Sequence, residues 1–335
     1  MTMVRARYGL RLILVFITVF ISGCEILMPS PPPNVGNRVY VANESGNSVS
    51  VIDAATLTPM KTVPLNLKGA HDLALTRDGR TLFASNLLSG ALAVIDTATF
   101  EIIATIPTGN RCHSLALTND ERQLWIVNIG DNNVSILDVA RLRILGTIPV
   151  GKLPGHVRFS KDGRYAYVTG QEEALVTVID ASSHQIIKTI PVGKLPHFII
   201  PSPDGRYLWG GSTGGTEVYI IDMTTNVRVQ TIEVGTKPQH IAFGVRGMFG
   251  PFAYVAVEGA DEVVVIDATK PGTSKIVDRI KVGGKPSGVG ASPEGGRIYV
   301  GLQDSDELAV IDTGTHRVIK KIPVGIKPVG VVASF

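Results

Sequence analysis

Five of the seven histidines in the chain recur at nearly the same place in a repeated sequence. They are His71, His113, His156, His197 and His240. Counted from the apolar run that follows each one, His71, His113 and His197 share one position, and His156 and His240 lie one residue later. Imidazole can ligate a metal ion, bind haem iron or donate to carboxylates. The shared position therefore predicts a ligand site, provided that the fold brings these residues together.

A basic residue precedes this position in every repeat, including the two repeats that have Ser287-Gly288 and Val329-Gly330 in place of histidine. The basic residues are Lys68, Arg111, Lys152, Lys194, Lys237, Lys285 and Lys327. A ring of cations would favour an anionic ligand. Two interpretations remain open at this point: a ligand-binding site, or a consensus connecting loop in which histidine satisfies loop carbonyl groups.

The repeat that positions these residues is an extended apolar run ending in an aspartate, and it returns every 42 to 45 residues. The aspartates are Asp53, Asp96, Asp138, Asp180, Asp222, Asp267 and Asp312. A period of this length indicates one supersecondary unit copied along the chain. Each copy holds four short runs rich in Val, Ile, Thr and Tyr, bounded by Gly, Pro, Asn and Asp, which is typical of strands and turns. Turn geometry alone explains the aspartates, whose carboxylates should bond their own backbone two residues on.

Seven units of four strands predict an all-β, seven-bladed β-propeller with four antiparallel strands per blade. The first copy begins at Arg38 without a first strand, and the chain ends in a lone first strand at residues 327–334. That last strand can complete the first blade and close the ring, which removes two exposed edges. Since the innermost strands line the central channel, the five histidines should cluster at its mouth. We expect His184 and His316, in third-to-fourth turns on the opposite face, to be exposed.

Several segments carry a family resemblance. VYVANESGNSVSVIDAATLTPMKTVPL, IYVGLQDSDELAVIDTGTHRVIKKIPVG and the SPDGRY turn resemble the YVTN-repeat β-propellers, over residues 37–335. The resemblance implies a fold and leaves the function open, because propellers host many unrelated tasks. The propellers of haem d1-type nitrite reductases, and lipoproteins of the same maturation pathway, are similar to that family, which implies a tetrapyrrole held by histidine and basic residues. Those propellers generally have eight blades and this chain has seven, so no axial ligand is assigned.

The N-terminus has the pattern of an export signal. Three arginines precede an apolar run at residues 12–21, which is too short to be read as a spanning helix. It ends in Ile21-Ser22-Gly23-Cys24, which resembles the bacterial lipobox, with acylation of Cys24. We expect a signal peptide at residues 1–23, an acylated cysteine and proline-rich linker at 24–36, and the propeller at 37–335. Glu25 resembles the residue that follows the cysteine in outer-membrane lipoproteins, so we expect an exported, periplasmic, lipid-anchored monomer.

Charge and cysteine content exclude some classes of function. The chain has 32 Lys and Arg against 29 Asp and Glu, but the signal contributes three arginines and no acid, so the mature chain is neutral. Together with an aromatic content of 6%, this argues against nucleic-acid binding. Cys112 is the one cysteine beside Cys24, so an internal disulfide is impossible, and no Cys-x-x-Cys-His haem attachment exists.

These observations predict a membrane-anchored propeller with a non-catalytic binding or scaffolding role, exercised through the face that bears the five histidines. Its partner would be a protein or a small anionic ligand. The first alternative is the handling of a haem-type tetrapyrrole or a divalent metal by the cluster. The second is a lactonase-type hydrolase, because some propellers with SPDGRY-like turns resemble sugar-acid lactonases. No His-Glu-x-x-His helix or phosphate loop supports catalysis.

Overall fold

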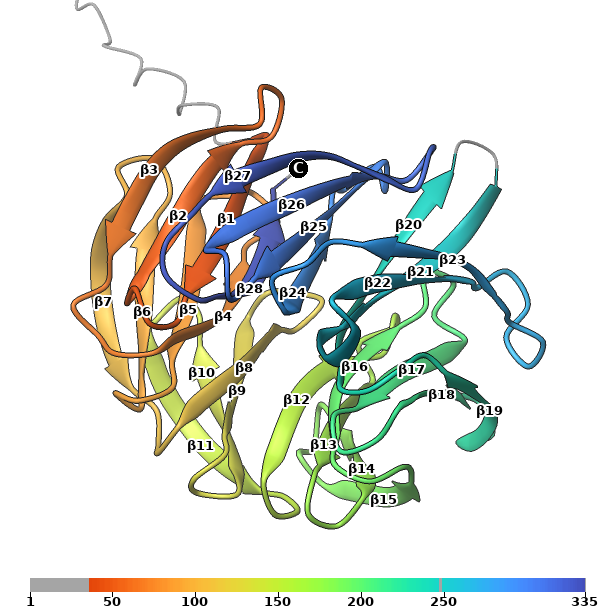
Figure 1. Cartoon of the computed structure of the whole chain (residues 1–335). Helices are drawn as coiled ribbons and strands as arrows, with labels where there is room; N and C mark the ends of the chain where they lie inside the picture. The colour runs from red at the N-terminus through yellow and green to blue at the C-terminus, as the bar shows by residue number, and fades with distance from the viewer. Residues whose placement is uncertain (1–35, 247–248, 335) are drawn as a thin grey trace, which may run out of the picture. The chain divides into compact units, whose positions relative to one another are not determined.

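The computed structural model describes residues 36–246 and 249–334, and within them the secondary structure is almost wholly β (Figure 1). Seven antiparallel four-stranded sheets account for these residues, with one short 3₁₀ helix, η1, at Glu258–Ala260. None of the helices in the described residues is long and apolar enough to cross a membrane. The predicted signal peptide, Cys24 and nearly all of the predicted linker lie outside the described residues.

We number the sheets, or blades, in chain order and give their strands from the channel outward. Blade 1 consists of β28 (Pro328–Ala333), β1 (Arg38–Asn43), β2 (Ser48–Asp53) and β3 (Thr58–Pro64). Blade 2 consists of β4 (Ala70–Leu75), β5 (Thr81–Asn86), β6 (Ala91–Asp96) and β7 (Glu101–Pro107). Blade 3 consists of β8 (Cys112–Leu117), β9 (Gln123–Asn128), β10 (Asn133–Asp138) and β11 (Arg143–Pro149).

The remaining blades repeat this order. Blade 4 consists of β12 (Pro154–Phe159), β13 (Tyr165–Gly170), β14 (Leu175–Asp180) and β15 (Ile186–Pro191). Blade 5 consists of β16 (Pro196–Pro201), β17 (Tyr207–Ser212), β18 (Glu217–Asp222) and β19 (Val227–Glu233). Blade 6 consists of β20 (Pro238–Arg246), β21 (Phe249–Val257), β22 (Glu262–Asp267) and β23 (Ile276–Lys281). Blade 7 consists of β24 (Pro286–Ala291), β25 (Arg297–Leu302), β26 (Glu307–Asp312) and β27 (Arg317–Pro323).

The last strand closes the ring, as the sequence predicts. β28 pairs with β1 in antiparallel register, with Val331 opposite Val41 and Ala333 opposite Val39. The amide of Arg38 also donates to Ser334 Oγ at 2.8 Å. The innermost strand of each blade contacts that of the next around the whole ring, including β24 with β28 and β28 with β4. The predicted seven-bladed propeller is therefore confirmed.

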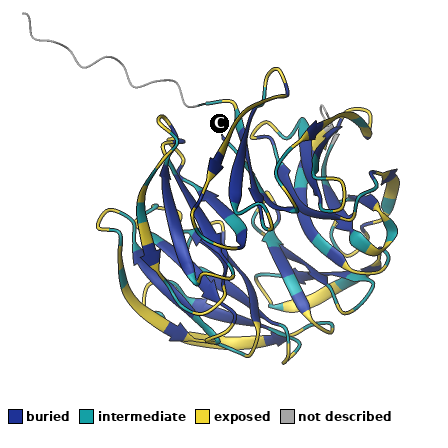
Figure 2. Ribbon diagram, turned by 60° about the vertical axis from the view of Figure 1, so that its left-hand side comes forward, coloured by how far each residue is buried: buried dark blue, intermediate teal, exposed yellow. Residues whose placement is uncertain are grey.

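Burial within each blade is greatest in the second and third strands and lowest in the outermost strand. The inner strands are mostly buried, whereas the fourth strands carry exposed residues along most of their length (Figure 2). Large aromatic side chains of the second strands fill the space between blades, and Tyr40, Trp125, Tyr167 and Tyr254 are at most 1% exposed. Burying one such side chain stabilises the fold by about 1.5–3 kcal/mol.

The repeat aspartates have the predicted turn role. Asp53 Oδ1 accepts the amides of Ala55 and Thr56 at 2.9 and 2.7 Å, and the other six aspartates also accept an amide two or three residues on. The hydrogen bond donated by the backbone amide of Thr56 is the main reason that the pKa of Asp53 lies below its usual value. Hydrogen bonds within their own turns therefore explain why the repeat has aspartate at these positions.

The prediction that both turn histidines are exposed is wrong, because His316 is 9% exposed and His184 is half-buried. Both His184 and His316 lie in third-to-fourth turns, at a position whose backbone is left-handed, with φ of 60° and 56°. Both side chains lie against the neighbouring blade. His316 packs 5.5 Å from the ring of Phe252 with Nδ1 3.3 Å from Asp278 Oδ2, and half-buried His184 lies 5.6 Å from Trp125.

Candidate functional site

Each inner strand starts with a bulge, and this irregularity positions the histidines. In β4, Ala70 is opposite Asn86 and Leu73 is opposite Ala84, so two residues face one on the partner strand. The other six inner strands show a register shift at the same place. A bulge re-aims the side chains of its residues. It therefore explains how histidines one residue apart in the repeat, such as His71 and His156, reach the same channel.

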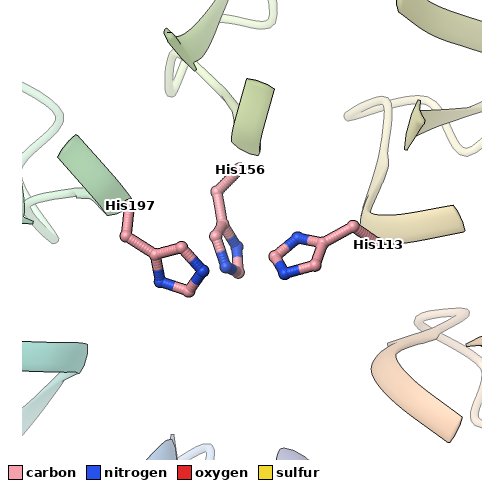
Figure 3. A group of neighbouring side chains, drawn as sticks. All are labelled: His113, His156 and His197. Carbon is pink, nitrogen blue, oxygen red and sulfur yellow. The ribbon is translucent and has the colours of Figure 1, made fainter. Parts of the chain in front are cut away.

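Three histidines from successive blades point toward one another at the channel axis (Figure 3). His113 on β8, His156 on β12 and His197 on β16 each offer a ring nitrogen, and the three nitrogens lie within 4.8 Å of one another. Their ring centroids are 5.1 Å apart for His113 and His156, 4.9 Å for His156 and His197, and 5.3 Å for His113 and His197.

The other two histidines flank this trio. The ring of His71 on β4 lies 4.1 Å from that of His113, and the ring of His240 on β20 lies 5.0 Å from that of His156. The structure thus brings all five sequence-predicted histidines into one cluster, which we call the histidine cluster. Residues 41 or more positions apart along the chain meet there because successive inner strands line the same channel.

The hydrogen bonds of the cluster separate its members. His113 Nδ1 lies 2.9 Å from the carbonyl of Gly155, and His240 Nδ1 lies 3.1 Å from the carbonyl of Ser287. Because a carbonyl only accepts, Nδ1 donates in both residues and Nε2 keeps a free lone pair. His156 is fully buried, and neither of its ring nitrogens has a partner among the described residues. Nδ1 of His71 and of His197 is likewise unpaired within the described chain.

Burial holds these imidazoles in their neutral form. It lowers the pKa of His71, His197 and His240 to about 3, and the pKa of His113 and His156 lies well below the usual value. The neighbouring histidines add a smaller effect in the same direction, because protonating one ring disfavours charge on the next. A neutral imidazole with a free lone pair is the form that ligates a metal ion.

Hydroxyl groups on second strands fix the backbone that carries the cluster. Thr169 Oγ1 accepts the amide of His156 at 2.8 Å and donates to the carbonyl of His197 at 2.9 Å. Ser85 Oγ accepts the amide of Asp72 and donates to the carbonyl of His113. These two bridges join successive blades at the bulges, so they set the spacing between neighbouring histidines.

The seven basic residues that precede the inner strands stay at the rim of the channel. All are exposed except half-buried Lys327. Four of them pair with acids of the neighbouring loops: Lys152 with Glu172, Lys237 with Glu258, Lys285 with Asp304 and Lys327 with Glu44. The structure therefore brings the histidines together but leaves Lys68, Arg111, Lys152, Lys194, Lys237, Lys285 and Lys327 outside the cluster.

Two charged residues that the sequence reasoning missed lie next to the cluster. Asp72 Oδ2 accepts from Ser114 Oγ at 3.1 Å and from the amide of Leu115 at 3.0 Å. Arg158 Nη1 donates to Ser114 Oγ at 3.2 Å, so one hydroxyl links the two charges. For Arg158, the available signal was a charged residue at the position of the inner strand where two other repeats have Ala74 and Ala116.

Comparisons with known proteins agree with this architecture. Residues 103–206, which include His113, His156 and His197, match the family of YNCE-like β-propellers. The match covers less than half of the chain, so it shows a similarity to that family over these residues. No curated protein matches the sequence.

Solved structures resemble this propeller over most of its length. A hydrazine synthase from Kuenenia stuttgartiensis shares 21% identity with a TM-score of 0.71, over 80% of this chain and 90% of that one. The periplasmic gluconolactonase PpgL of Pseudomonas aeruginosa shares 19% identity with a TM-score of 0.74, over 88% and 98%. The dihydro-haem d1 dehydrogenase NirN in complex with DHE shares 18% identity with a TM-score of 0.69, over 88% and 66%. At these identities the likeness shows the fold alone.

Proposed function

We propose that this propeller binds a transition metal ion through His113, His156 and His197 and that its role is binding rather than catalysis. The observation that carries the proposal is His156, whose two ring nitrogens are buried without a partner among the described residues. A buried polar group without a hydrogen bond costs about 1–3 kcal/mol. A bound ion would remove that cost, and imidazole sets suit Zn²⁺, Cu²⁺ and Ni²⁺.

The distances between the three nitrogens are consistent with a site in which the histidines move closer together when a metal ion binds. Nitrogens about 2.1 Å from one zinc ion lie about 3.5 Å apart, compared with separations of up to 4.8 Å here. Small rotations of the three side chains would close that gap. His71 and His240 flank these three side chains, with ring centroids 4.1 Å from His113 and 5.0 Å from His156.

A tetrapyrrole is the second candidate, because NirN, whose propeller has a similar fold, is in complex with DHE. The size of the channel cavity favours a metal ion over a tetrapyrrole. Its cavity beside the histidine cluster measures about 270 Å³, less than the roughly 300–1,000 Å³ of pockets for drug-sized ligands. The fold likeness to PpgL supports an assay on gluconolactone, in which we expect no turnover.

The test is a binding measurement on the purified, chelator-treated full-length chain. Calorimetric titration with Zn²⁺ should show one ion per chain, and Co²⁺ should give the visible spectrum of an imidazole-ligated ion. His156→Leu should weaken zinc binding at least 100-fold, whereas His184→Ala, a histidine outside the cluster, should not change it. Equal affinity in the wild type and His156→Leu would refute the metal site. A haem spectrum that depends on His156 would favour the tetrapyrrole.

We also propose that the mature protein is held at the periplasmic face of the outer membrane by acyl chains on Cys24. The lipobox-like sequence before Cys24 and the glutamate after it support this location. Fractionation should find the chain in the outer membrane and should find Cys24→Ala released from it, because stable anchoring needs two acyl chains. Recovery of the unmodified wild type in the soluble fraction would contradict the anchor.

A further inference from the structure

The channel holds a cavity of about 270 Å³ on the far side of the histidine cluster from the rim. Its walls come from inner strands of six blades and include His240, which links it to the cluster. Most of the lining is apolar, with Phe198, Ile241 and Val289 among the side chains. Two charged residues, Asp72 and Arg158, also line it. A mostly apolar cavity with a few polar groups is the usual form of a small-molecule site.

The guanidinium of Arg158 is only partly satisfied by the protein. Its Nη1 donates to Ser114 Oγ at 3.2 Å, to the carbonyl of Leu115 at 3.2 Å and to that of Val157 at 2.8 Å. No described residue accepts a hydrogen bond from its Nε or Nη2. The ring of Phe198 lies 5.4 Å from Cζ and supports the cation from one side. One edge of the guanidinium is therefore left for a ligand.

Asp72 does not take up that edge. Its Oδ1 accepts the amide of Leu73 at 2.9 Å, and its Oδ2 accepts from Ser114 Oγ and the amide of Leu115. No ion pair within 4.0 Å joins Asp72 to Arg158 in the described chain. Three donors thus satisfy the carboxylate, whereas arginine stays protonated in proteins and keeps its charge in the cavity.

We propose that this cavity is a binding site for a small carboxylic acid with an apolar body, whose carboxylate is held by the free edge of Arg158. The planar guanidinium fork matches a carboxylate with two parallel hydrogen bonds. The apolar walls would cover the rest of the molecule. The site goes beyond the proposed metal function and does not depend on it, because none of its charged contacts is a cluster histidine.

The test is a calorimetric titration of the full-length chain with benzoate, and with benzamide as an uncharged ligand of nearly the same shape. Benzoate should bind one to one, and benzamide at least 10-fold more weakly. Arg158→Met, which keeps the length of the side chain, should weaken benzoate binding at least 30-fold while zinc affinity changes less than 3-fold. Arg158→Lys keeps the charge without the fork and should fall between. Thermal melts verify that both variants fold.

Two results would overturn the site: no binding of either benzoate or acetate by the wild type, or benzoate binding that Arg158→Met leaves unchanged. The titrations run with and without zinc separate this proposal from the metal site. Arg158-dependent benzoate binding in a chain that binds no zinc would remove the metal function and leave the carboxylate site standing. Zinc binding without benzoate binding would support the metal function and refute the carboxylate site.

Discussion

The two sides of the channel use the same backbone device with different residues. On one side, β4, β8, β12, β16 and β20 place a histidine at the bulge, an arrangement that we call the histidine arc. On the other side, β24 and β28 have Ser287-Gly288 and Val329-Gly330, the glycine arc. A Cβ on Gly288 would collide with the carbonyl oxygen of Val329, and one on Gly330 with that of His71. The glycine arc is therefore closed by backbone packed against backbone.

The comparison separates what the fold needs from what a ligand needs. Both arcs keep the bulge and a left-handed residue before the strand, such as Leu153 at φ 49° and Lys285 at φ 51°. Because the glycine arc completes the ring without imidazole, the fold does not require histidine at this position. A histidine that only filled space would satisfy a carbonyl, as His113 and His240 do. His156 does not, and that difference favours a ligand role.

The largest expected effect is the pH dependence of the histidine arc. The folded pKa of His71, His197 and His240 is about 3, whereas the unfolded value is about 6.5. Below pH 6.5 the unfolded chain binds protons that the native chain does not, so stability is full above 6.5 and falls toward pH 3. Each histidine contributes up to about 1.4 kcal/mol per pH unit, and we expect a loss on the order of 5 kcal/mol between pH 7 and 5.

Urea unfolding of the metal-free protein at a series of pH values measures this loss. The window above pH 5 avoids the carboxylates, which titrate lower. His156→Leu should flatten the slope, and His184→Ala should not. A stability that stays constant from pH 7 to 5 would show that the imidazoles are not held neutral by burial.

The next effect belongs to the glycine arc. Gly330→Ala places a Cβ against the carbonyl oxygen of His71, which is backbone and cannot rotate away. We expect a loss of about 3 kcal/mol in the free energy of unfolding, at the upper end for overpacking. Gly146→Ala on the outer strand β11 is the control, because nothing lies within 4 Å of its added Cβ. Equal unfolding midpoints for the two variants would contradict the backbone packing.

Within the histidine arc, two substitutions should have opposite signs. His156→Leu removes two unpaired buried nitrogens and should stabilise the metal-free protein by about 1 kcal/mol. His113→Leu leaves the carbonyl of Gly155 without its donor and should destabilise it by about 1 kcal/mol. Urea melts of the two variants beside the wild type measure both changes. The same sign for both would mean that the hydrogen bonds do not distinguish these histidines.

The smallest effect is expected at the rim. Lys152 is exposed and pairs with exposed Glu172 at 3.8 Å, and such pairs contribute about 0–1 kcal/mol. Lys152→Gln should change stability by less than about 0.5 kcal/mol and zinc affinity by less than twofold. A larger change in zinc affinity would show that the basic residues at the rim contribute to the metal site.

The sequence repeats were sufficient to predict most of the fold. The details of the site depend on packing between blades, which the repeats do not reveal. The period and the missing first strand at Arg38 were enough to predict seven blades and their closure by β28, because strand pairing follows the local pattern. In the sequence, His71 and His156 occupy different positions of the repeat, and only the bulge shows that both side chains can reach the channel. The unpaired nitrogens of His156, the free edge of Arg158 and the burial of His316 depend on contacts between blades, which no local pattern records.

The most direct test of the metal centre is zinc K-edge X-ray absorption on the full-length chain loaded with one equivalent of Zn²⁺. The account predicts scattering from about three imidazoles with nitrogens about 2.0–2.1 Å from the zinc, and one imidazole fewer in His156→Leu. A zinc shell without imidazole scattering, or one that is the same in His156→Leu, would contradict it.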